Sequence, residues 1–336
     1  MRKLFTILAL LLLTVGFAFG QEKCVQLKFR YIGGEQSIIL DWSDGTLRWS
    51  AHLGDKEIVA PSRLTMTTDR GVWGEGIKSA DVKKFDCHTG NYFSWYSCAV
   101  VNFGDYSVEL RAYMEGVAYR FISNIEGEYK IIDELAEFAF LEDDMAWVPY
   151  VNFKPDATTD YATQFYTSFE NTYDYVALKD IDWRRLIFTP AVVESNGLDV
   201  CIVESNLEDY PGMFLSNRDG DGVIDTEFAT VPDVVEQGDY NMLQGVVKSR
   251  KPYIAECSGK RTFPWRGVVI GGATDLANSR LVWNLADECR LKDTSWIKPV
   301  KYIGIWWELM LGKSKWYYTD DFKGVKLGES DYTKVK

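Results

Sequence analysis

The stretch Ile38-Ile39-Leu40-Asp41-Trp42, Ser43-Asp44-Gly45-Thr46, Leu47-Arg48-Trp49-Ser50-Ala51 decides the fold class. Its two outer segments are rich in β-branched and aromatic residues, and the Asp-Gly pair between them is a strong signal for a tight turn. The pattern predicts two antiparallel strands joined by residues 43–46.

Similar strand-like segments follow along most of the chain. Three that are separated by glycine-containing turns are residues 99–102, 106–113 and 117–122. Residues 107–113 alternate between apolar and polar side chains, as expected for a strand with one buried face. Residues 131–140 are the only moderate candidate for a helix. We therefore expect a mainly β protein, built as a large antiparallel β-sandwich of two packed sheets.

Composition and charge narrow the function classes. The chain has 336 residues, of which 46% are hydrophobic and 15% aromatic, so it can bury a large core in one or two domains. Its net charge of −12 and the lack of a lysine or arginine run argue against nucleic acid as a partner. A neutral ligand such as a sugar, or a cation, suits this balance, although the aromatic excess also fits core packing.

Histidine is rare, because only His52 and His88 are present and neither belongs to an HExxH motif. A histidine-based zinc site or a Ser/His/Asp triad is therefore poorly supported. Carboxylates would have to perform any acid or base chemistry.

The first 20 residues have the pattern of a secretory signal peptide. Arg2-Lys3 precedes an apolar run over residues 4–17 and then Ala18-Phe19-Gly20, which places the mature start at Gln21. A membrane anchor is the alternative, but it needs roughly 20 apolar residues, and no later segment reaches that length. We expect export to the periplasm and no membrane span.

An exported chain with six cysteines can form disulfides, and six positions allow 15 full pairings, so the pairing stays open. Cys87 and Cys98 flank an aromatic segment and would be able to staple a hairpin. Cys201 lies inside an apolar run, which predicts a buried thiol.

Near residue 288 the strand-like segments give way to polar residues, which predicts a domain boundary. We assign residues 21–288 to the sandwich domain. After the polar residues 287–295, the apolar run 301–307 resembles a strand that is buried on both faces of a parallel sheet. Residues 289–336 are too few for an independent domain, so we expect them to be the start of a second one.

Five segments carry a family resemblance: Pro61-Ser62-Arg63-Leu64, Glu115-Gly116-Val117-Ala118-Tyr119-Arg120-Phe121, Asp209-Tyr210-Pro211-Gly212-Met213, Phe263-Pro264-Trp265-Arg266 and Asp293-Thr294-Ser295-Trp296-Ile297-Lys298-Pro299. In this order and spacing they resemble glycoside hydrolase family 97 over nearly the whole mature chain. The segment Lys301-Tyr302-Ile303-Gly304-Ile305-Trp306-Trp307-Glu308 resembles the α-glucosidase branch, which includes a starch-utilisation enzyme of gut Bacteroides, more than the α-galactosidase branch.

The resemblance implies a calcium-dependent enzyme with an N-terminal, galactose-mutarotase-like super-sandwich, a central (β/α)8 barrel and a C-terminal β domain. It implies α-glucosides such as malto-oligosaccharides as substrates. Residues 289–336 would then be the first strand of a truncated barrel, and the catalytic acid and base would lie in the missing barrel. We expect this chain to hold no catalytic residue and to be inactive alone, because a glycosidase needs two carboxyl groups held on different barrel strands.

Three residues are implied as site residues. In the family a glutamate from the sandwich joins barrel glutamates around Ca²⁺, and the context of Glu204 in Ile202-Val203-Glu204-Ser205-Asn206-Leu207 matches it. The alternative for Glu204 is a solvated residue at the end of a strand. Trp306 and Trp307 would end the first barrel strand, where one of them can line the sugar pocket while core packing accounts for the other or for both.

Residues 217–227 raise the question of a second Ca²⁺. Oxygen-bearing side chains at Asn217, Asp219, Asp221 and Asp225 match positions 1, 3, 5 and 9 of a calcium loop, but position 12 is Phe228. A polar hairpin loop rich in turn formers is the favoured interpretation.

Two readings besides the enzyme fragment stay open at this point. One is a free-standing carbohydrate-binding or adhesive β-sandwich without catalysis. The other is a scaffold that only supports partners.

Overall fold

The computed structural model describes residues 23–88, 95–152, 160–166, 169–237, 245–300 and 311. Its contacts divide the chain between Glu288 and Cys289. The predicted signal peptide and the segment that contains Trp306 and Trp307 lie outside the described residues. The assignment of domains therefore stays a prediction.

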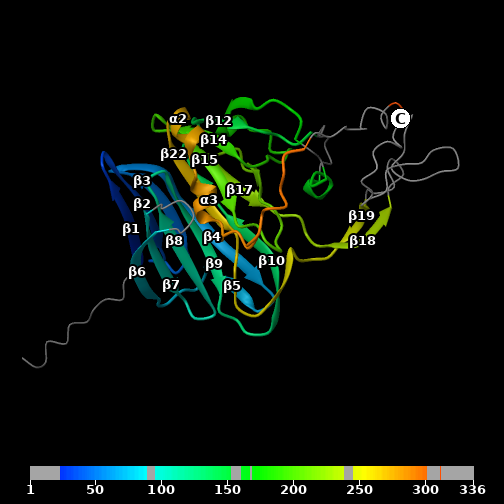
Figure 1. The fold of residues 1–336 in the computed structure, drawn as a ribbon, viewed down its shortest axis with the longest axis horizontal. Helices are drawn as coiled ribbons and strands as arrows, with labels where there is room; N and C mark the ends of the chain where they lie inside the picture. Colours follow the sequence, from blue (N-terminus) through cyan, green and yellow to red (C-terminus); the bar gives the residue numbers. More distant parts are fainter. Residues whose placement is uncertain are drawn as a thin grey trace, which may run out of the picture. The chain divides into compact units, whose positions relative to one another are not determined.

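The fold is dominated by two large antiparallel sheets, which confirms the expected sandwich (Figure 1). The first ten-stranded sheet contains β1 (Cys24–Tyr31), β2 (Gly34–Asp41), β3 (Arg48–Leu53), β4 (Lys56–Thr68), β5 (Gly71–Trp73), β10 (Glu128–Ala136), β11 (Phe138–Ala139), β16 (Phe214–Ser216), β17 (Val223–Glu227) and β20 (Ala255–Ser258).

The second ten-stranded sheet runs from β13 at one margin to β6 at the other. It contains β6 (Asp81–His88), β7 (Trp95–Asn102), β8 (Tyr106–Ala112), β9 (Gly116–Ser123), β12 (Met145–Val148), β13 (Asp174–Ala177), β14 (Ala191–Ser195), β15 (Leu198–Ser205), β21 (Arg261–Thr262) and β22 (Trp265–Gly271). A separate pair is β18 (Pro232–Gln237) and β19 (Gly245–Arg250).

The predicted hairpin at the start of the chain is confirmed. Asp41 of β2 faces Arg48 of β3, and the turn between them is closed by the bond from the Gly45 N–H to the Trp42 carbonyl. Gly45 has a φ of 89°, a backbone conformation that glycine adopts without steric cost. The Asp-Gly pair therefore fixes the register of the first strands.

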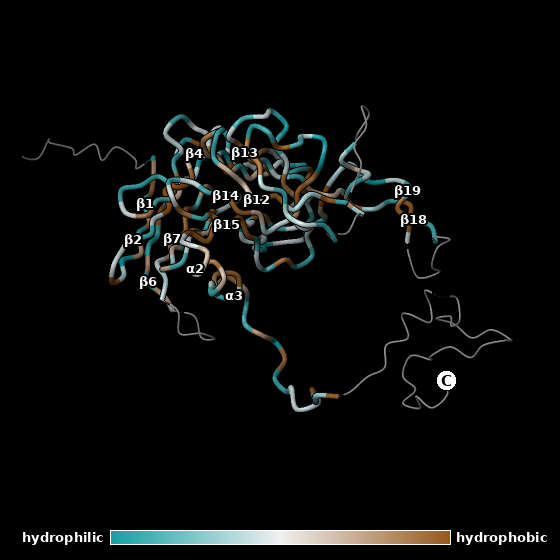
Figure 2. The backbone as a smooth tube through the Cα atoms, turned by 90° about the horizontal axis from the view of Figure 1, so that it is seen from above, coloured by the Kyte–Doolittle hydropathy of each residue, from teal (hydrophilic) through white to brown (hydrophobic). Residues whose placement is uncertain are grey.

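Apolar side chains from the two sheets meet in one large core. Trp49 packs against Tyr119 of the other sheet and against Phe138, with ring centroids 5.2 and 5.5 Å away. In Figure 2 many hydrophobic stretches lie within the sandwich, others lie in β18 and in the chain after α3, and most outer loops are hydrophilic. Many of the aromatic residues counted in the sequence are therefore core residues.

Two short helices, α2 (Ala273–Asn278) and α3 (Leu281–Leu285), pack on β15 and β22 (Figure 1). Leu281 and Leu285 join a second cluster with Trp265 and Val203 on the outer face of the sheet. Two 3-10 turns, η1 (Tyr161–Thr163) and η2 (Leu178–Asp180), lie among the loops. Among the described residues no helix is long and apolar enough to cross a membrane.

The helix suggested for residues 131–140 is wrong, because these residues form most of β10 and all of β11. The register of β10 against β4 shifts between Ile131 and Asp133. After this irregularity the buried positions are Glu134 and Ala136, so buried residues 131 and 134 are three apart, as on a helix. A β-bulge thus imitated helical spacing.

The cysteines of the described residues are free thiols in the structure. Cys87 and Cys98 lie on the β6–β7 hairpin, but Cys87 faces Tyr96 and Cys98 faces Phe85. They are diagonal neighbours, and such pairs lie farther apart than a disulfide prefers. Cys201 is half-buried, and burial raises the pKa of its thiol to about 11.

Candidate functional site

Glu204 lies one residue before the end of β15, as the sequence predicted, but it is not solvated. Its side chain is 15% exposed and faces Arg266, its register partner on β22. The Arg266 Nη1 donates to the Glu204 Oε2 at 2.7 Å, and the backbone N–H of Met213 contacts both carboxylate oxygens at 3.1 Å. The carboxylate is therefore held by two elements of the sandwich.

Arg266 connects this carboxylate to the opposite sheet. Its Nε and Nη2 donate to the two oxygens of Glu134 on β10, at 2.8 and 3.0 Å, in a bidentate pair. Its guanidinium also lies 5.0 Å from the centre of the Phe228 ring. The side chains of Arg266 and Glu134 are 1% and 3% exposed, so the charges are almost fully removed from water.

The electrostatics follow from two carboxylates sharing one guanidinium. Burial raises the pKa of Glu204 above its ordinary value, while Arg266 and the Met213 N–H oppose that shift. The pKa of Arg266 is raised as well: burial alone would lower it, but the charge of Glu134 and its hydrogen bonds outweigh that effect. The Glu134–Arg266–Glu204 network is thus a buried ionic cluster with a formal charge of −1.

Two of the five sequence landmarks meet at this network. Arg266 ends the segment 263–266, and Met213 ends the segment 209–213. Sequence reasoning selected Glu204 but missed Glu134 and Arg266. The one sequence signal for Glu134 is that an acidic residue occupies this position of β10. No local pattern connects it with Arg266, which lies 132 positions later.

Glu204 offers one ligand position to a cation. Calcium takes about six to eight oxygen ligands. In the described part of the chain no group of three or more His, Cys, Asp or Glu side chains is placed to hold a metal ion. A carboxylate has about four lone-pair sites, so Glu204 keeps capacity for one more partner beside Arg266 and Met213. The residues that the structure describes around Glu204 fit a single contributed ligand, and they do not make up a complete metal site.

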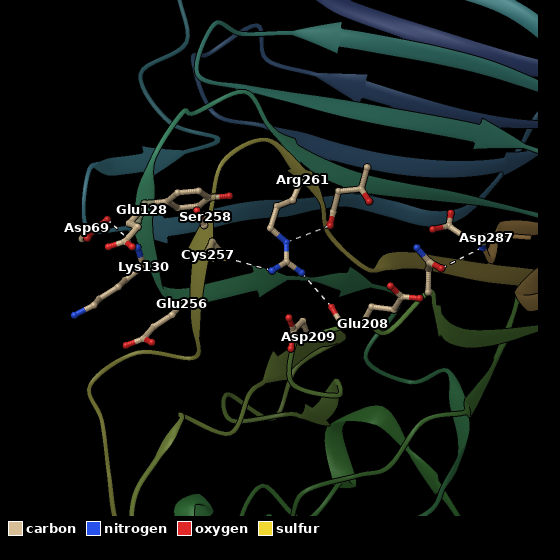
Figure 3. A pocket seen from close by; sticks show the side chains of 13 residues that line it. Asp69, Glu128, Lys130, Glu208, Asp209, Glu256, Cys257, Ser258, Arg261 and Asp287 are labelled. Atoms are coloured by element: carbon tan, nitrogen blue, oxygen red, sulfur yellow. Dashed lines mark hydrogen bonds between the residues drawn. The ribbon is translucent and has the colours of Figure 1, made fainter. Parts of the chain in front are cut away.

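An acidic cavity of about 1000 Å³ borders the chain that follows Glu204 (Figure 3). Its rim is formed by Asp69, Glu128, Tyr129, Lys130, Asn206, Glu208, Asp209, Glu256, Cys257, Ser258, Arg261, Thr262 and Asp287. Arg261 points across it and donates to the Glu208 carbonyl at 3.1 Å. This contact stabilises the loop that follows Glu204. The contacts that the structure describes for the lining residues do not pair a nucleophile with an adjacent base.

Residues 217–222 form the hairpin loop between β16 and β17, and residues 223–227 are β17 itself, in line with the hairpin favoured from the sequence. The buried Asn217 donates to the carbonyls of Leu178 and Asp221, and its own oxygen accepts from the Gly220 N–H at 2.9 Å. Asp221 accepts from the Val223 N–H at 2.8 Å. Oxygens at positions 1 and 5 of the loop therefore close the turn.

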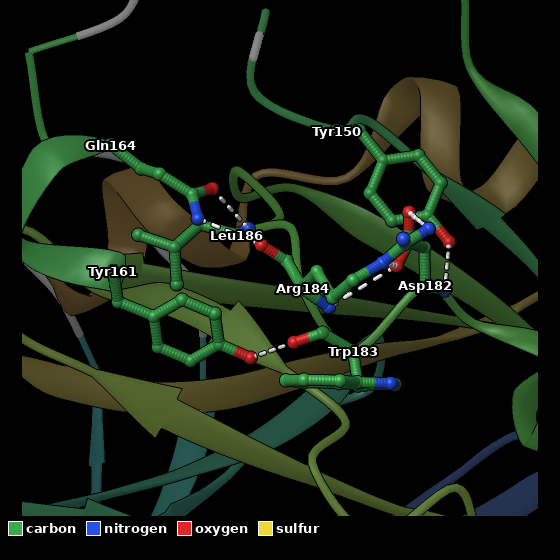
Figure 4. Close-up of polar contacts among 7 residues, drawn as sticks. All are labelled: Tyr150, Tyr161, Gln164, Asp182, Trp183, Arg184 and Leu186. Carbon is green, nitrogen blue, oxygen red and sulfur yellow. Dashed lines mark hydrogen bonds and ion pairs between the residues drawn. The ribbon is translucent and has the colours of Figure 1, made fainter. Parts of the chain in front are cut away.

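A second, smaller cavity of about 290 Å³ was not foreseen. It is lined by Asp160, Tyr161, Trp183 and Arg218. The segment that carries Trp183 is tied down by side chains of neighbouring loops (Figure 4). In the sequence these residues looked like ordinary members of aromatic and charged loops, and only the fold brings them together.

A family model and a curated relative both match most of this chain. The family model described as Glycosyl-hydrolase 97 N-terminal matches residues 33–287. A retaining alpha-galactosidase of Bacteroides thetaiotaomicron is 37% identical over 287 residues, which cover 79% of this chain and 43% of that protein.

Solved structures show the same fold. A glycoside hydrolase family 97 enzyme from Pseudoalteromonas sp. strain K8, in complex with acarbose, superimposes with a TM-score of 0.66 at 24% identity, covering 88% of this chain and 43% of that one. A beta-arabinopyranosidase gives a TM-score of 0.54 at 16% identity over 74% of this chain and 40% of that one. The chain thus spans less than half the length of these relatives.

Replacing Arg266 should test the ionic cluster. Arg266→Met keeps the length of the side chain but leaves two buried carboxylates unpaired, so we expect a loss of about 3–5 kcal/mol in the free energy of unfolding. The matched control is Arg48→Met, because Arg48 forms an exposed pair with Asp44, which should contribute less than about 1 kcal/mol. Equal losses in urea denaturation of the two variants would contradict the assignment.

Asp225 predicts a specific pH dependence of stability. Burial raises its pKa to about 6 from an ordinary 3.8, and Glu137 and Glu227 add to the shift. The folded state then holds this proton more tightly than the unfolded chain, so stability falls as pH rises from 3.8 to about 6. Asp225→Asn should gain stability relative to the original chain across this window and keep the gain above it. If denaturation series at several pH values gave the same difference in stability between Asp225→Asn and the original chain, the prediction would be wrong.

Proposed function

The chain belongs to glycoside hydrolase family 97, and from that premise we propose that it is the N-terminal sandwich of an exported enzyme that hydrolyses α-glycosidic bonds. The observation that carries the proposal is the match of the family model over residues 33–287. The buried cluster around Glu204, in which two family landmarks meet, supports it.

An α-galactoside is the first candidate substrate. The supporting observation is the 37% identity to a protein named a retaining alpha-galactosidase. The α-glucosides expected from the sequence, such as malto-oligosaccharides, are the second candidate, favoured by the resemblance of residues 301–308 to the α-glucosidase branch. That segment and the substrate-binding roles of Trp306 and Trp307 lie outside the described residues.

In this proposal the sandwich supports catalysis without performing it. The acid and base would come from the barrel, because hydrolysis requires two carboxyl groups held at a fixed separation across the scissile bond. Glu204 would supply one ligand to Ca²⁺, whose positive charge would help to hold and polarise the reacting groups when bound. Arg266 fixes the orientation of that ligand through its contacts with Glu134 and Glu204.

Export to the periplasm is part of the proposal and rests on residues 1–20 alone. The basic start, the apolar run and the small residues before Gln21 have the order that signal peptidases recognise. The thiols of the described cysteines would then meet an oxidising environment.

Hydrolysis assays separate the candidate functions. The 336-residue chain alone should release no p-nitrophenol from the α-galactoside or the α-glucoside. A longer protein that joins this chain to a complete barrel should prefer the galactoside by at least about tenfold in kcat/KM, because a sugar hydroxyl of the wrong configuration leaves polar groups of the site unpaired. Preference for the glucoside would support the second candidate, and sugar binding by the chain with no hydrolysis by the longer protein would support a stand-alone binding domain.

The calcium role of Glu204 has its own test in the same longer protein. Glu204→Gln should lower the affinity for Ca²⁺, measured by calorimetry, by at least about tenfold, the scale seen when even groups that support a metal ligand are lost. Arg266 keeps its pair with Glu134 in this variant, so folding should survive. Glu194→Gln on the neighbouring strand β14 is the control. Unchanged calcium affinity in Glu204→Gln would remove the assignment.

A further inference from the structure

The small cavity beside Trp183 has the features of a built ligand site. Its volume of about 290 Å³ is close to the lower end of the range for small-molecule pockets. Its four lining residues combine two aromatic rings, one carboxylate and one guanidinium, and they come from three separate loops. Nothing in the proposed function uses these residues.

Trp183 is exposed, yet the backbone on both sides of it is fixed. The residue is 54% accessible to solvent. Before it, the Asp182 N–H donates to the Tyr150 hydroxyl at 2.9 Å, and the Trp183 carbonyl accepts from the Tyr161 hydroxyl (Figure 4). The indole is therefore displayed on a loop that cannot easily move.

The segment after Trp183 is held by a buried side chain. Gln164 is 0% exposed, and its Nε2 donates to the Arg184 carbonyl at 2.8 Å. Its Oε1 accepts from the Leu186 N–H at 2.9 Å (Figure 4). Fixing a loop in advance reduces the entropy lost when a ligand binds, so this rigidity favours binding over simple surface exposure.

The charged groups of the cavity are also oriented. The Arg218 guanidinium lies 4.5 Å from the centre of the Tyr161 ring, and Glu227 accepts from its Nε and Nη2 at 2.6 Å. A guanidinium has five N–H donors, so donors remain for a ligand. The Asp160 Oδ1 accepts from the Ala162 N–H at 2.9 Å, which leaves its second oxygen for another donor.

This combination fits a neutral sugar ring. An indole face packs well against the C–H face of a pyranose, while a fixed guanidinium and carboxylate can donate to and accept from adjacent hydroxyls. The Arg218 charge is already matched by Glu227, which disfavours a strongly anionic ligand. The volume admits about one or two rings.

We propose that Trp183, Tyr161, Arg218 and Asp160 form a binding site for a pyranose unit of an α-linked oligosaccharide. The choice of an α-linked sugar rests on the proposed function, whereas the site itself rests on the geometry of these four residues. The sandwich would thus bind carbohydrate through its own loops.

Calorimetric titration of the 336-residue chain with melibiose and with maltotriose tests the site, and cellobiose serves as the β-linked comparison. We expect binding of at least one α-linked sugar, at least a tenfold loss of affinity in Trp183→Ala, and partial retention in Trp183→Phe. Trp147→Ala is the matched control, because Trp147 is 42% exposed but lies outside this cavity. Thermal unfolding of each variant shows whether it is folded.

Two results would overturn the inference: no binding of either α-linked sugar at millimolar concentration, or equal affinity in the original chain and a folded Trp183→Ala. Binding of cellobiose with the same affinity would remove the α-linked assignment and keep the site. Hydrolysis by a longer protein whose sandwich binds no sugar would remove this inference alone. Sugar binding by the chain, with no hydrolysis by the longer protein, would remove the proposed function alone.

Discussion

The contact between Arg266 and the two glutamates on opposite sheets is the constraint on which the site depends. Strands β10 and β15 belong to different sheets, and the guanidinium joins their carboxylates across the interior of the sandwich. An unpaired charge at such a depth would be very costly, so the sheets must keep the spacing that satisfies all three groups. The orientation of Glu204 is therefore a property of the whole sandwich.

Around this polar cluster the sandwich is held by apolar packing. Trp49, Tyr119 and Phe138 illustrate how rings from both sheets interlock in the core. Apolar packing tolerates small shifts, whereas the bidentate pair of Arg266 with Glu134 has a strict geometry. The aromatic packing therefore stabilises the sandwich, whereas the ionic cluster fixes the position of the Glu204 carboxylate.

The sequence predicted well what is encoded locally. The Asp-Gly turn at Gly45, the presence of a strand over residues 106–112 and the strand-end placement of Glu204 depend on a few neighbouring residues, and the structure has them. The alternation along residues 107–113 does not mark one exposed face, because Ser107 and Glu109 are buried as well. Residues 131–140 were misread because a β-bulge shifted the alternation by one position. Contacts between residues far apart in the sequence could not be predicted. Arg266 pairs with Glu134 across 132 positions, and Gln164 bonds to the loop of Trp183 across about 20. No periodic pattern in the sequence indicates either contact.

The second sheet ends at β6, and this margin has a consequence for the behaviour of the protein in solution. A strand at the edge of a sheet has unpaired backbone groups that can recruit a strand of another molecule. Lys83 and Lys84 lie side by side on β6, are exposed, and point to opposite faces. A second copy that approached this edge would have to bury both ammonium groups or bring them close to its own. Charge at this margin would therefore disfavour edge-to-edge pairing between copies of this mostly β protein.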